Sequence, residues 1–468
     1  MNKRFRVCDF NQPFLLPPSL QDWLPQDHLA RFVADVTNEL DLSLIYAEYE
    51  RSDGRGLSAY HPLLLTRLLL YGYSIGVTSS RAIEKASYDN VAFRYLAADQ
   101  HPDHDTIASF RQQHLEALAG LFVQALRLCH KAGLVKLGNI AIDGTKIQAN
   151  ASTRHSVSYQ KLTEQERYWQ SVTERLLAEA QQKDQQEDER FGKGERGDSL
   201  PGELADAQSR LERIRQAKAE LEREAQQELE ALGADAMGKR GRPRKQDAVE
   251  RSPEERRQLK KRKKKLSRAR KNAQQPSRQY NFVDPDSRVM KDNGKKCFVQ
   301  AYNAQIAVDA HLQVIVAAEV TQQTTDREQL VPMVNSVRSS NSLEDATIIA
   351  DAGYWDTASL HAPGLDGIRV AVSPDSQPQV PGAPLPPNAP QNEEAFRMRE
   401  WLTTPAGRIL YLLRKMTVEP VFGQIKEVRG IRRFRLRGFR PVQCEWKLIC
   451  ATHNLLKLFR HRPKPQPA

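Results

Sequence analysis

Two aspartates of the sequence end strand-forming runs, at positions where a carboxylate can do chemistry. Asp143 ends the run IAID before Gly144, and Asp351 ends the run TIIAD shortly before Gly353. Parallel strands of one sheet present their carboxyl ends at the same edge, where α/β sheets bind ligands. We therefore expect Asp143 and Asp351 to lie close together, although about 200 residues separate them.

The chemistry of such a pair follows from its charge. Neighbouring carboxylates repel each other, so the pair takes up a proton or binds a divalent cation. Mg²⁺ prefers oxygen ligands and keeps water molecules that phosphate oxygens can replace. Taken alone, Asp143 also fits an ordinary Asp-Gly turn. The two aspartates together predict a metal site that acts on a phosphate-containing substrate.

A third carboxylate comes from the stretch MTVEPVFGQIKEVRG. Proline is tolerated in the first turn of a helix, so we expect Thr417 as the N-cap and Glu419 beside Pro420 in that turn. Lys426 lies two turns further, about 10 Å along the same face. It suits a phosphate contact, and a solvated helix lysine is the alternative. The basic and aromatic run from Arg432 to Arg440 extends this surface.

The order strand-Asp, strand-Asp, helix-Glu resembles the DDE transposases of the RNase H-like, retroviral-integrase superfamily. Within it the chain is similar to the bacterial insertion-sequence transposases grouped around insertion sequence 1182. The motifs are IAIDGTKIQANAS, IADAGYW and VEPVFGQIKEVRGIRRFRLRG, and the block from GLSAYHPLLL to HDTIASFRQ resembles the group's helical amino-terminal domain. The resemblance implies an α/β fold: an RNase H-like core, which is a mixed sheet flanked by helices, with an all-α N-terminal domain and a long charged helical or coiled insert.

The resemblance also implies an activity. It implies a DNA transposase that cleaves DNA and transfers strands at the terminal inverted repeats of an insertion sequence. Asp143, Asp351 and Glu419 are the expected catalytic residues and ligands of two Mg²⁺ ions, for which Mn²⁺ can substitute. The rival from another class is a non-catalytic DNA-binding protein or an inactive transposase relic, which needs the basic segments but not the three carboxylates.

A Tyr-Arg-Glu-Lys signature surrounds the glutamate in the wider family. Tyr411, Arg414, Glu419 and Lys426 correspond to it, and the resemblance implies that Tyr411, Arg414 and Lys426 contact DNA. Four residues separate Arg414 from Glu419, where the family usually has three. Lys415 is therefore the alternative that keeps the family's spacing.

The positive charge of the chain is concentrated in one segment. The net charge is +12, and residues 239–271 contain 17 Lys and Arg against 4 Asp and Glu. Such a basic segment is typical of nucleic-acid binding. Within it, KRGRPRK resembles an AT-hook that binds the DNA minor groove, and a disordered basic linker is the alternative. The DNA-binding residues expected there are Arg240, Arg242, Arg244 and Lys245.

Other patterns concern packing. Leu204, Ala207, Leu211, Ile214, Leu221 and Ala225 follow coiled-coil spacing, which fits either dimerisation or an antiparallel arm. Trp355 and Trp446 suit stacking on a flipped base or core packing. Residues 103–133 predict a helix with Asp105 as the N-cap and Gly133 as the stop. With the preceding helix it could form a DNA-binding helix-turn-helix, and ordinary helical packing is the alternative.

These patterns predict a domain order and a setting. The five cysteines contain no C-x-x-C, which favours a reduced cytoplasmic protein. The resemblance implies that it is bacterial and nucleoid-associated when bound to DNA. The apolar stretch around Arg67 is too short for a membrane span, so we expect a buried helix and no membrane partner. The expected partners are double-stranded DNA and a second copy in a homodimer. The expected segments are a helical, DNA-binding or packing domain (1–135), the first core strand (136–152), a charged insert (153–280), the remaining core (281–460) and a disordered tail (461–468).

Overall fold

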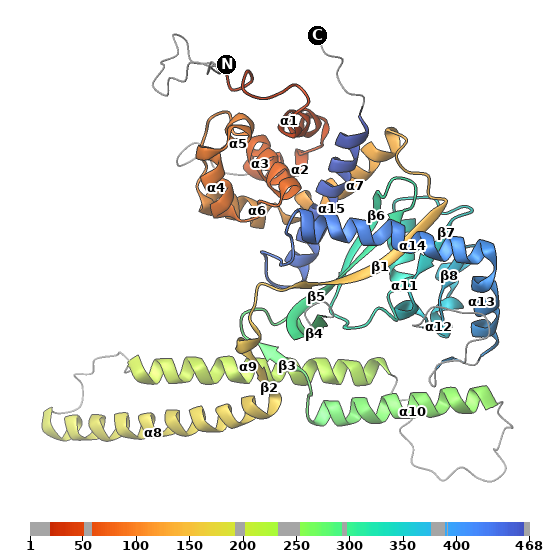
Figure 1. Ribbon diagram of the computed structural model, residues 1–468. Coiled ribbons are helices and arrows are strands. Elements are labelled where there is room, and N and C mark those ends of the chain that lie inside the picture. Colours follow the sequence, from red (N-terminus) through yellow and green to blue (C-terminus); the bar gives the residue numbers. More distant parts are fainter. Residues whose placement is uncertain are drawn as a thin grey trace, which may run out of the picture. The chain divides into compact units, whose positions relative to one another are not determined.

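The computed structural model describes residues 19–50, 59–191, 202–232, 253–292, 297–375, 389–390 and 392–462. The chain is mixed α/β and divides into two compact units. The first unit combines residues 1–150 with 286–468, and the second contains residues 151–285 (Figure 1). The Pro-rich stretch 376–388, the AT-hook-like residues Arg240, Arg242, Arg244 and Lys245, and the tail from residue 463 lie outside the described residues.

Helices dominate the amino-terminal part of the first unit. They are α1 (Leu29–Glu39), α2 (Ser43–Glu50), α3 (Pro62–Ile75), α4 (Ser80–Asp89), α5 (Val91–Leu96), α6 (His104–Gln113) and α7 (Leu115–Lys131). The helix expected over residues 103–133 is thus two helices, which meet at His114. The N-cap is Asp103, whose side chain accepts from the Thr106 N–H, and not Asp105, which lies in the first turn. Gly133 follows α7 with φ of 71°, as expected of a helix stop.

A mixed sheet forms the centre of the first unit. Its strands are β1 (Asn139–Gln148), β4 (Arg288–Asp292), β5 (Cys297–Asp309), β6 (Ile315–Thr321), β7 (Thr347–Ala350) and β8 (Arg369–Val372). The order is β4-β5-β1-β7-β8, and β6 also pairs with β5. β5 and β6 form an antiparallel hairpin. β1, β7 and β8 are parallel, so the polarity expected for the two aspartate strands is confirmed.

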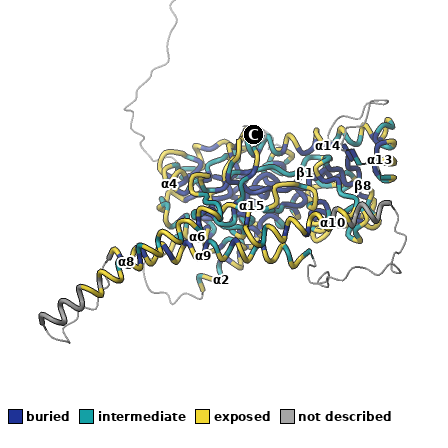
Figure 2. The backbone as a smooth tube through the Cα atoms, turned by 90° about the horizontal axis from the view of Figure 1, so that it is seen from below, coloured by how far each residue is buried: buried dark blue, intermediate teal, exposed yellow. Residues whose placement is uncertain are grey.

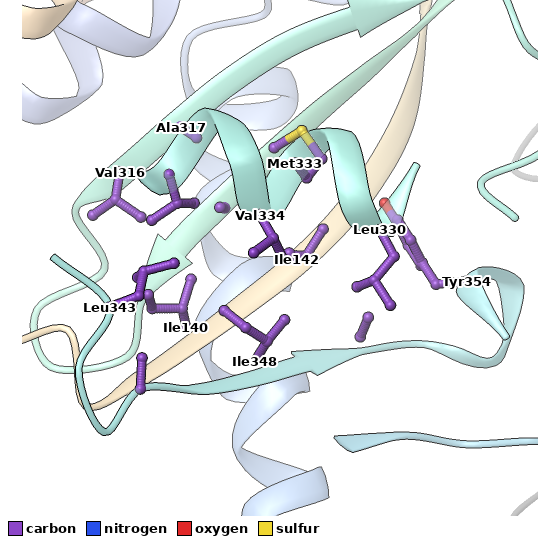
Figure 3. Close-up of a cluster of buried hydrophobic side chains, with 14 of the residues drawn as sticks. Ile140, Ile142, Val316, Ala317, Leu330, Met333, Val334, Leu343, Ile348 and Tyr354 are labelled. Atoms are coloured by element: carbon purple, nitrogen blue, oxygen red, sulfur yellow. The ribbon is translucent and has the colours of Figure 1, made fainter. Parts of the chain in front are cut away.

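One face of the sheet is a hydrophobic core under α11 (Leu330–Arg338). Ile140 and Ile142 of β1 pack there with Ile348 of β7 and with Met333 and Val334 of the helix (Figure 3). Side chains alternate along a strand, so residues 143 and 145 of β1 face the opposite side. The apolar residues therefore fix the register that turns Asp143 away from this core.

Helices of the carboxyl-terminal part follow β8 and the short helix α12 (Thr357–Leu360). They are α13 (Glu393–Thr403), α14 (Pro405–Gly423), a π-helical turn (Gln424–Val428) and α15 (Phe439–His461). Trp446 of α15 is fully buried, and its indole N–H donates to the Gln305 carbonyl at 3.0 Å. Trp355 is also buried, in the core under α11. Both tryptophans therefore pack in the core, and neither presents a ring for stacking on a base.

The helix around Glu419 begins much earlier than the sequence predicts. α14 begins at Pro405, where the Thr404 side chain caps the Gly407 N–H. Thr417 lies inside the helix, and its hydroxyl donates to the Leu413 carbonyl at 2.7 Å. The prediction that Thr417 is the N-cap is wrong, and Glu419 lies near the end of α14 instead of in its first turn.

Pro420 is accommodated inside α14 through a distant side chain. Proline lacks the N–H that would bond the carbonyl four residues earlier, here that of Met416. The Gln313 side chain, from the β5–β6 hairpin, donates to this carbonyl at 2.9 Å instead. The carbonyl left free by Pro420 is thereby paired, and the helix continues to Gly423.

The second unit is a helical arm. Its short strands β2 (Ser156–Ser158) and β3 (Gln279–Asn281) pair with each other, and its helices are α8 (Tyr159–Phe191), α9 (Gly202–Ala231) and α10 (Pro253–Gln274). α9 packs against both α8 and α10. All six residues of the coiled-coil pattern are buried within the chain: Leu204, Ala207, Leu211, Ile214, Leu221 and Ala225. Of the two alternatives, the apolar stripe of α9 thus serves an intramolecular arm, whose outer surfaces are largely exposed (Figure 2).

Two further features of the described residues are the apolar stretch around Arg67 and the cysteines. The apolar stretch containing Arg67 forms the mostly buried helix α3, as expected. Across the described ranges, no helix combines the length and apolarity needed to cross a membrane. Cys129, Cys297, Cys444 and Cys450 are free thiols.

Candidate active site

Asp143 occupies the middle of β1 on the face opposite the hydrophobic core. Its Oδ1 accepts the Gly144 N–H at 2.8 Å, and its Oδ2 accepts from Arg414 Nη1 of α14 at 3.2 Å. The Asp143 side chain is 18% exposed, so the carboxylate is largely withdrawn from water yet still reachable.

Asp351 follows the last residue of β7. Ile142 of β1 is in register with Ala350 of β7. The next residues along the two parallel strands, Asp143 and Asp351, are therefore neighbours at the point where β7 ends. The Asp351 Oδ1 accepts the Gly353 N–H at 2.8 Å and caps the short 3₁₀ turn Ala352–Tyr354. The structure thus brings together the two aspartates singled out from the sequence.

The electrostatics of the pair favour a bound proton or cation. Burial, followed by the charge of Asp351, raises the pKa of Asp143 to about 7, while Arg414 opposes the increase. Burial also raises the pKa of Asp351. Arg414 compensates the negative charge only in part, since both pKa values remain above the usual aspartate range.

Arg414 and Tyr411 approach the pair from α14. The Arg414 guanidinium carbon lies 5.9 Å from the centre of the Tyr411 ring, and burial raises the pKa of Tyr411. The side chain of Arg414 is 11% exposed, whereas Lys415 is exposed. Of these two alternatives for the family's arginine, the structure places Arg414 at the carboxylates.

Lys426 contacts β1 beyond Asp143, toward the carboxyl end of the strand. Its ammonium donates to the Thr145 hydroxyl and, at 3.0 Å, to the Lys146 carbonyl. Burial lowers the pKa of Lys426. It belongs to the π-helical turn after α14, so the simple two-turn spacing from Glu419 expected from the sequence does not apply. Lys426 is therefore a cation held against β1 and not a freely solvated helix lysine.

Glu419 is not assembled with the aspartates in this conformation. Glu419 is the fifth residue after Arg414, an offset of about 140° around an α-helix. Arg414 is buried against the sheet, and Glu419 is exposed. In the part of the chain that the structure describes, no three His, Cys, Asp or Glu side chains are placed to hold a metal ion together.

A polar network beneath Gly144 was not anticipated from the sequence. The Asp326 Oδ1 accepts from Asn303 Nδ2 at 2.6 Å and from Gln305 Nε2 at 2.7 Å, and it lies 3.6 Å from the Lys146 ammonium. The Tyr354 hydroxyl donates to the Gln305 side chain. The negative charge of Asp326 also raises the pKa of Asp143 and of Asp351. Two buried amides at alternate positions of an otherwise apolar strand, YNAQIAVD, are the signal that could have revealed this network.

The residues at this edge fit a divalent ion. The donors are carboxylate oxygens, which Mg²⁺ prefers, and one or two protein carboxylates suffice when water and substrate phosphates complete the shell. Both carboxylates have raised pKa values, as expected of negative charge that is buried without full compensation.

Comparison with known protein families gives two matches. Residues 18–113 match the family described as Transposase domain (DUF772), and residues 266–455 match the family described as Transposase DDE domain. The second range contains Asp351 and Glu419, whereas Asp143 lies between the two ranges. Neither the curated proteins nor the solved structures contain a match to the chain.

The matches define the class first: the protein is an enzyme with a transposase DDE domain, and it acts on DNA. Enzymes of this class use divalent metal ions, which agrees with the acidic edge of the sheet. The DUF772 domain followed by the DDE domain then specifies the family. The chain belongs to the insertion-sequence DDE transposases with the architecture of the insertion sequence 1182 group, and it is a DNA transposase.

Proposed function

We propose that this transposase cleaves and joins DNA at the terminal inverted repeats of an insertion sequence, using Asp143, Asp351 and Glu419. The observation that carries the proposal is the aspartate pair on the neighbouring parallel strands β1 and β7, with its raised pKa values. Two Mg²⁺ ions, replaceable by Mn²⁺, would supply activation of the attacking oxygen and stabilisation of the leaving oxygen.

The residues of the chain divide the remaining work. Asp143 and Asp351 provide the oxygen ligands. Arg414 holds the Asp143 carboxylate in place before the site is loaded, and with Tyr411 it then faces the phosphate of the DNA strand. Lys426, fixed to the strand beside them, contacts a neighbouring phosphate. These cations orient the phosphodiester for in-line attack.

Glu419 completes the site after a change in the winding of α14. Relative to the family's spacing, one extra residue lies between Arg414 and Glu419. After Pro420 the helix already departs from α-helical winding, in the π-helical turn Gln424–Val428. If this wide turn moved to the segment between Arg414 and Glu419, it would turn Glu419 by about one residue, or 100°, toward the strand.

The fold and domains follow the same proposal. Three parallel strands beside an antiparallel hairpin, with helices on both faces, support an RNase H-like core. This core comprises residues 136–152 and 281–460, preceded by a helical domain (1–135) and interrupted by a charged insert (153–280). The active species is a homodimer on double-stranded DNA, and it works in the bacterial cytoplasm on nucleoid DNA, where its substrate is.

The test uses duplexes taken from the DNA on either side of the gene. Asp143→Asn, Asp351→Asn and Glu419→Gln variants should bind these duplexes but neither nick them nor join pre-cleaved ends when Mg²⁺ is present. Glu427→Gln, which removes another exposed carboxylate of the same segment, is the matched control and should keep activity. Nicking without joining by the unmodified protein would identify a plain nuclease, and full activity of the Asp143 variant would overturn the assignment.

A further inference from the structure

An extended segment after the π-helical turn, residues 431–437, presents arginines from a fixed backbone. Ile431, Phe434 and Leu436 are buried. The residues between and after them are exposed arginines: Arg432, Arg433, Arg435 and Arg437. The burial pattern holds the segment against the protein while its guanidinium groups face solvent.

Hydrogen bonds fix this segment beside β1. The Gln148 N–H donates to the Arg432 carbonyl at 3.1 Å, and the Phe434 N–H donates to the Gln148 carbonyl at 2.9 Å. Further along, the buried Glu445 carboxylate accepts the backbone N–H groups of Arg435 and Leu436 at 2.9 Å. The segment therefore pairs with β1 beyond the point where β7 ends, on a rigid backbone.

The arginines of this surface fall into two groups. Arg432 pairs with Glu427, and the nearby Arg440 pairs with Glu116. In contrast, the side chains of Arg433, Arg435 and Arg437 donate to neutral acceptors: the Gln148 amide, the Thr78 hydroxyl and the Asn150 carbonyl. Among the described residues, no carboxylate forms an ion pair with these three guanidinium groups. Their positive charge remains available to an anionic partner.

The segment 431–437 continues a line that begins at the aspartate pair. Along β1, Arg414 contacts Asp143, Lys426 contacts Thr145, and the backbone of Gln148 is hydrogen-bonded to this segment. The strand from residue 143 to residue 148 spans about 17 Å at about 3.4 Å per residue. That length equals the rise of about five nucleotides at about 3.4 Å each.

We propose that Arg433, Arg435 and Arg437 bind consecutive phosphates of the DNA strand that leads away from the site of cleavage. The inference deepens the proposed function and depends on it for the position of the scissile phosphate. Phosphate contacts fix the register of DNA on a protein without reading its sequence. The segment thus sets the distance between the bound duplex and the carboxylates, and the paired Arg432 and Arg440 contribute little.

The experiment measures the salt dependence of DNA affinity for the full-length protein. The probe is a fluorescein-labelled duplex from the DNA that flanks the gene, titrated over a series of KCl concentrations. Each phosphate contact contributes about 0.9 to the slope of log affinity against log salt. Replacing Arg433, Arg435 and Arg437 by Gln should make the slope shallower by about 2.7, whereas replacing Arg432 and Arg440 by Gln should leave it unchanged.

Two further variants keep the result interpretable. The Arg433→Gln single variant removes only a contact with the Gln148 side chain, so it should fold, with a slope shallower by about 0.9. Replacing the three arginines by Lys keeps the charges and should restore most of the slope. Equal losses in the triple Gln variant and in the Arg432 and Arg440 control, or no loss in Arg433→Gln, would overturn the proposal. Nicking by the unmodified protein tests the proposed function separately, because it does not depend on these variants.

Discussion

At the scale of single residues, the proton on Asp143 links stability to metal binding. Its pKa of about 7 in the folded chain exceeds the value of about 4 in an unfolded chain. The folded state therefore binds the proton more tightly, so the stabilisation is complete below pH 4 and is lost as pH rises toward 7. At about 1.4 kcal/mol for each pKa unit, the loss reaches up to about 4 kcal/mol.

We expect Asp143→Asn to remove this dependence. With divalent ions chelated, urea unfolding of the unmodified protein should show stability falling between about pH 4 and pH 7, and the variant should show a flatter profile. The affinity of the unmodified protein for Mg²⁺ should rise over the same interval, because the ion displaces the proton. Parallel stability profiles for the two proteins would show that Asp143 is ionised throughout this range.

Gly144 is required by the network on the far side of the strand. A Cβ at this position would lie 2.2 Å from Gln305 Nε2 and 2.7 Å from Asp326 Oδ1. Gln305 is fully buried and bonded to both Asp326 and Tyr354, so it cannot move without losing those bonds. Gly144→Ala should therefore destabilise the protein by about 1–3 kcal/mol.

Gly120 of α7 offers the matched control for this substitution. A Cβ there would meet no atom within 4 Å, so Gly120→Ala should be neutral or stabilising by up to about 1 kcal/mol. Thermal unfolding of both variants measures the difference. An equally stable Gly144→Ala protein would mean that the network repacks freely and does not support Asp143.

At the scale of elements, α14 decides whether the third carboxylate reaches the site. Glu419 is exposed in the free protein, and the change in winding proposed above would bury it. Carbodiimide labelling of carboxylates, followed by mass spectrometry, should thus modify Glu419 in the free protein. Adding DNA and Ca²⁺, an oxygen-seeking ion used here in place of Mg²⁺, should protect it.

Glu400 of α13 provides the reference for that labelling. It is also exposed, and it lies outside the segment that rewinds, so its modification should stay constant. If Glu419 and Glu400 were labelled equally in the complex, α14 would keep its winding and Glu419 would not be a metal ligand. The acidic site would then consist of the two aspartates with solvent.

The elements differ in how far the sequence predicts them. β1, β7 and the β5–β6 hairpin follow from local runs of β-forming residues, and the position of Asp143 beside Asp351 follows from strand polarity. The start of α14 does not follow from local sequence. Pro420 can lie deep inside this helix because Gln313, which is 103 residues away in the chain, donates to the Met416 carbonyl. The Asp326 network likewise joins residues from three separate segments of the chain, so no spacing within one segment predicts it.

At the scale of the whole molecule, the amino-terminal helices share buried polar contacts with the carboxyl-terminal part. The Tyr73 hydroxyl donates to the fully buried Glu445 at 2.9 Å, and Arg111 donates to the Tyr73 hydroxyl at 3.2 Å. A chain that begins at residue 136 would leave the Glu445 carboxylate without these partners. Because a buried charge that loses its countercharge costs several kcal/mol, we expect that chain to lack a cooperative unfolding transition.

Glu445→Gln in the full-length chain tests the same contact with a smaller change than this truncation. It keeps an acceptor for Tyr73 but removes the charge that Arg111 faces, so it should lower stability without abolishing folding. Calorimetry distinguishes the two variants. A truncated chain that unfolds cooperatively would show instead that residues 1–135 form an independent domain.

The insert should be separable from the rest of the molecule. Its two attachment points meet the same short segment of the first unit, because Arg437 donates to the Asn150 carbonyl at 3.1 Å and the Phe439 N–H donates to Asp286 at 2.8 Å. A short Gly/Ser linker can therefore replace residues 151–285. The shortened protein should fold and still nick DNA with Mg²⁺, since its carboxylates and core lie in the first unit.

What the shortened protein should lose is the electrostatic contribution of residues 239–271 to DNA binding. Residues 239–271 contain 17 basic and 4 acidic side chains, and each phosphate that they neutralise adds about 0.9 to the salt slope. A full-length chain with the Lys and Arg of 239–271 changed to Gln is the matched control, and its slope should fall equally. If only the deletion weakened binding, the helical arm itself and not its charge would contact DNA. Loss of nicking in the deletion alone would make the arm part of the catalytic apparatus.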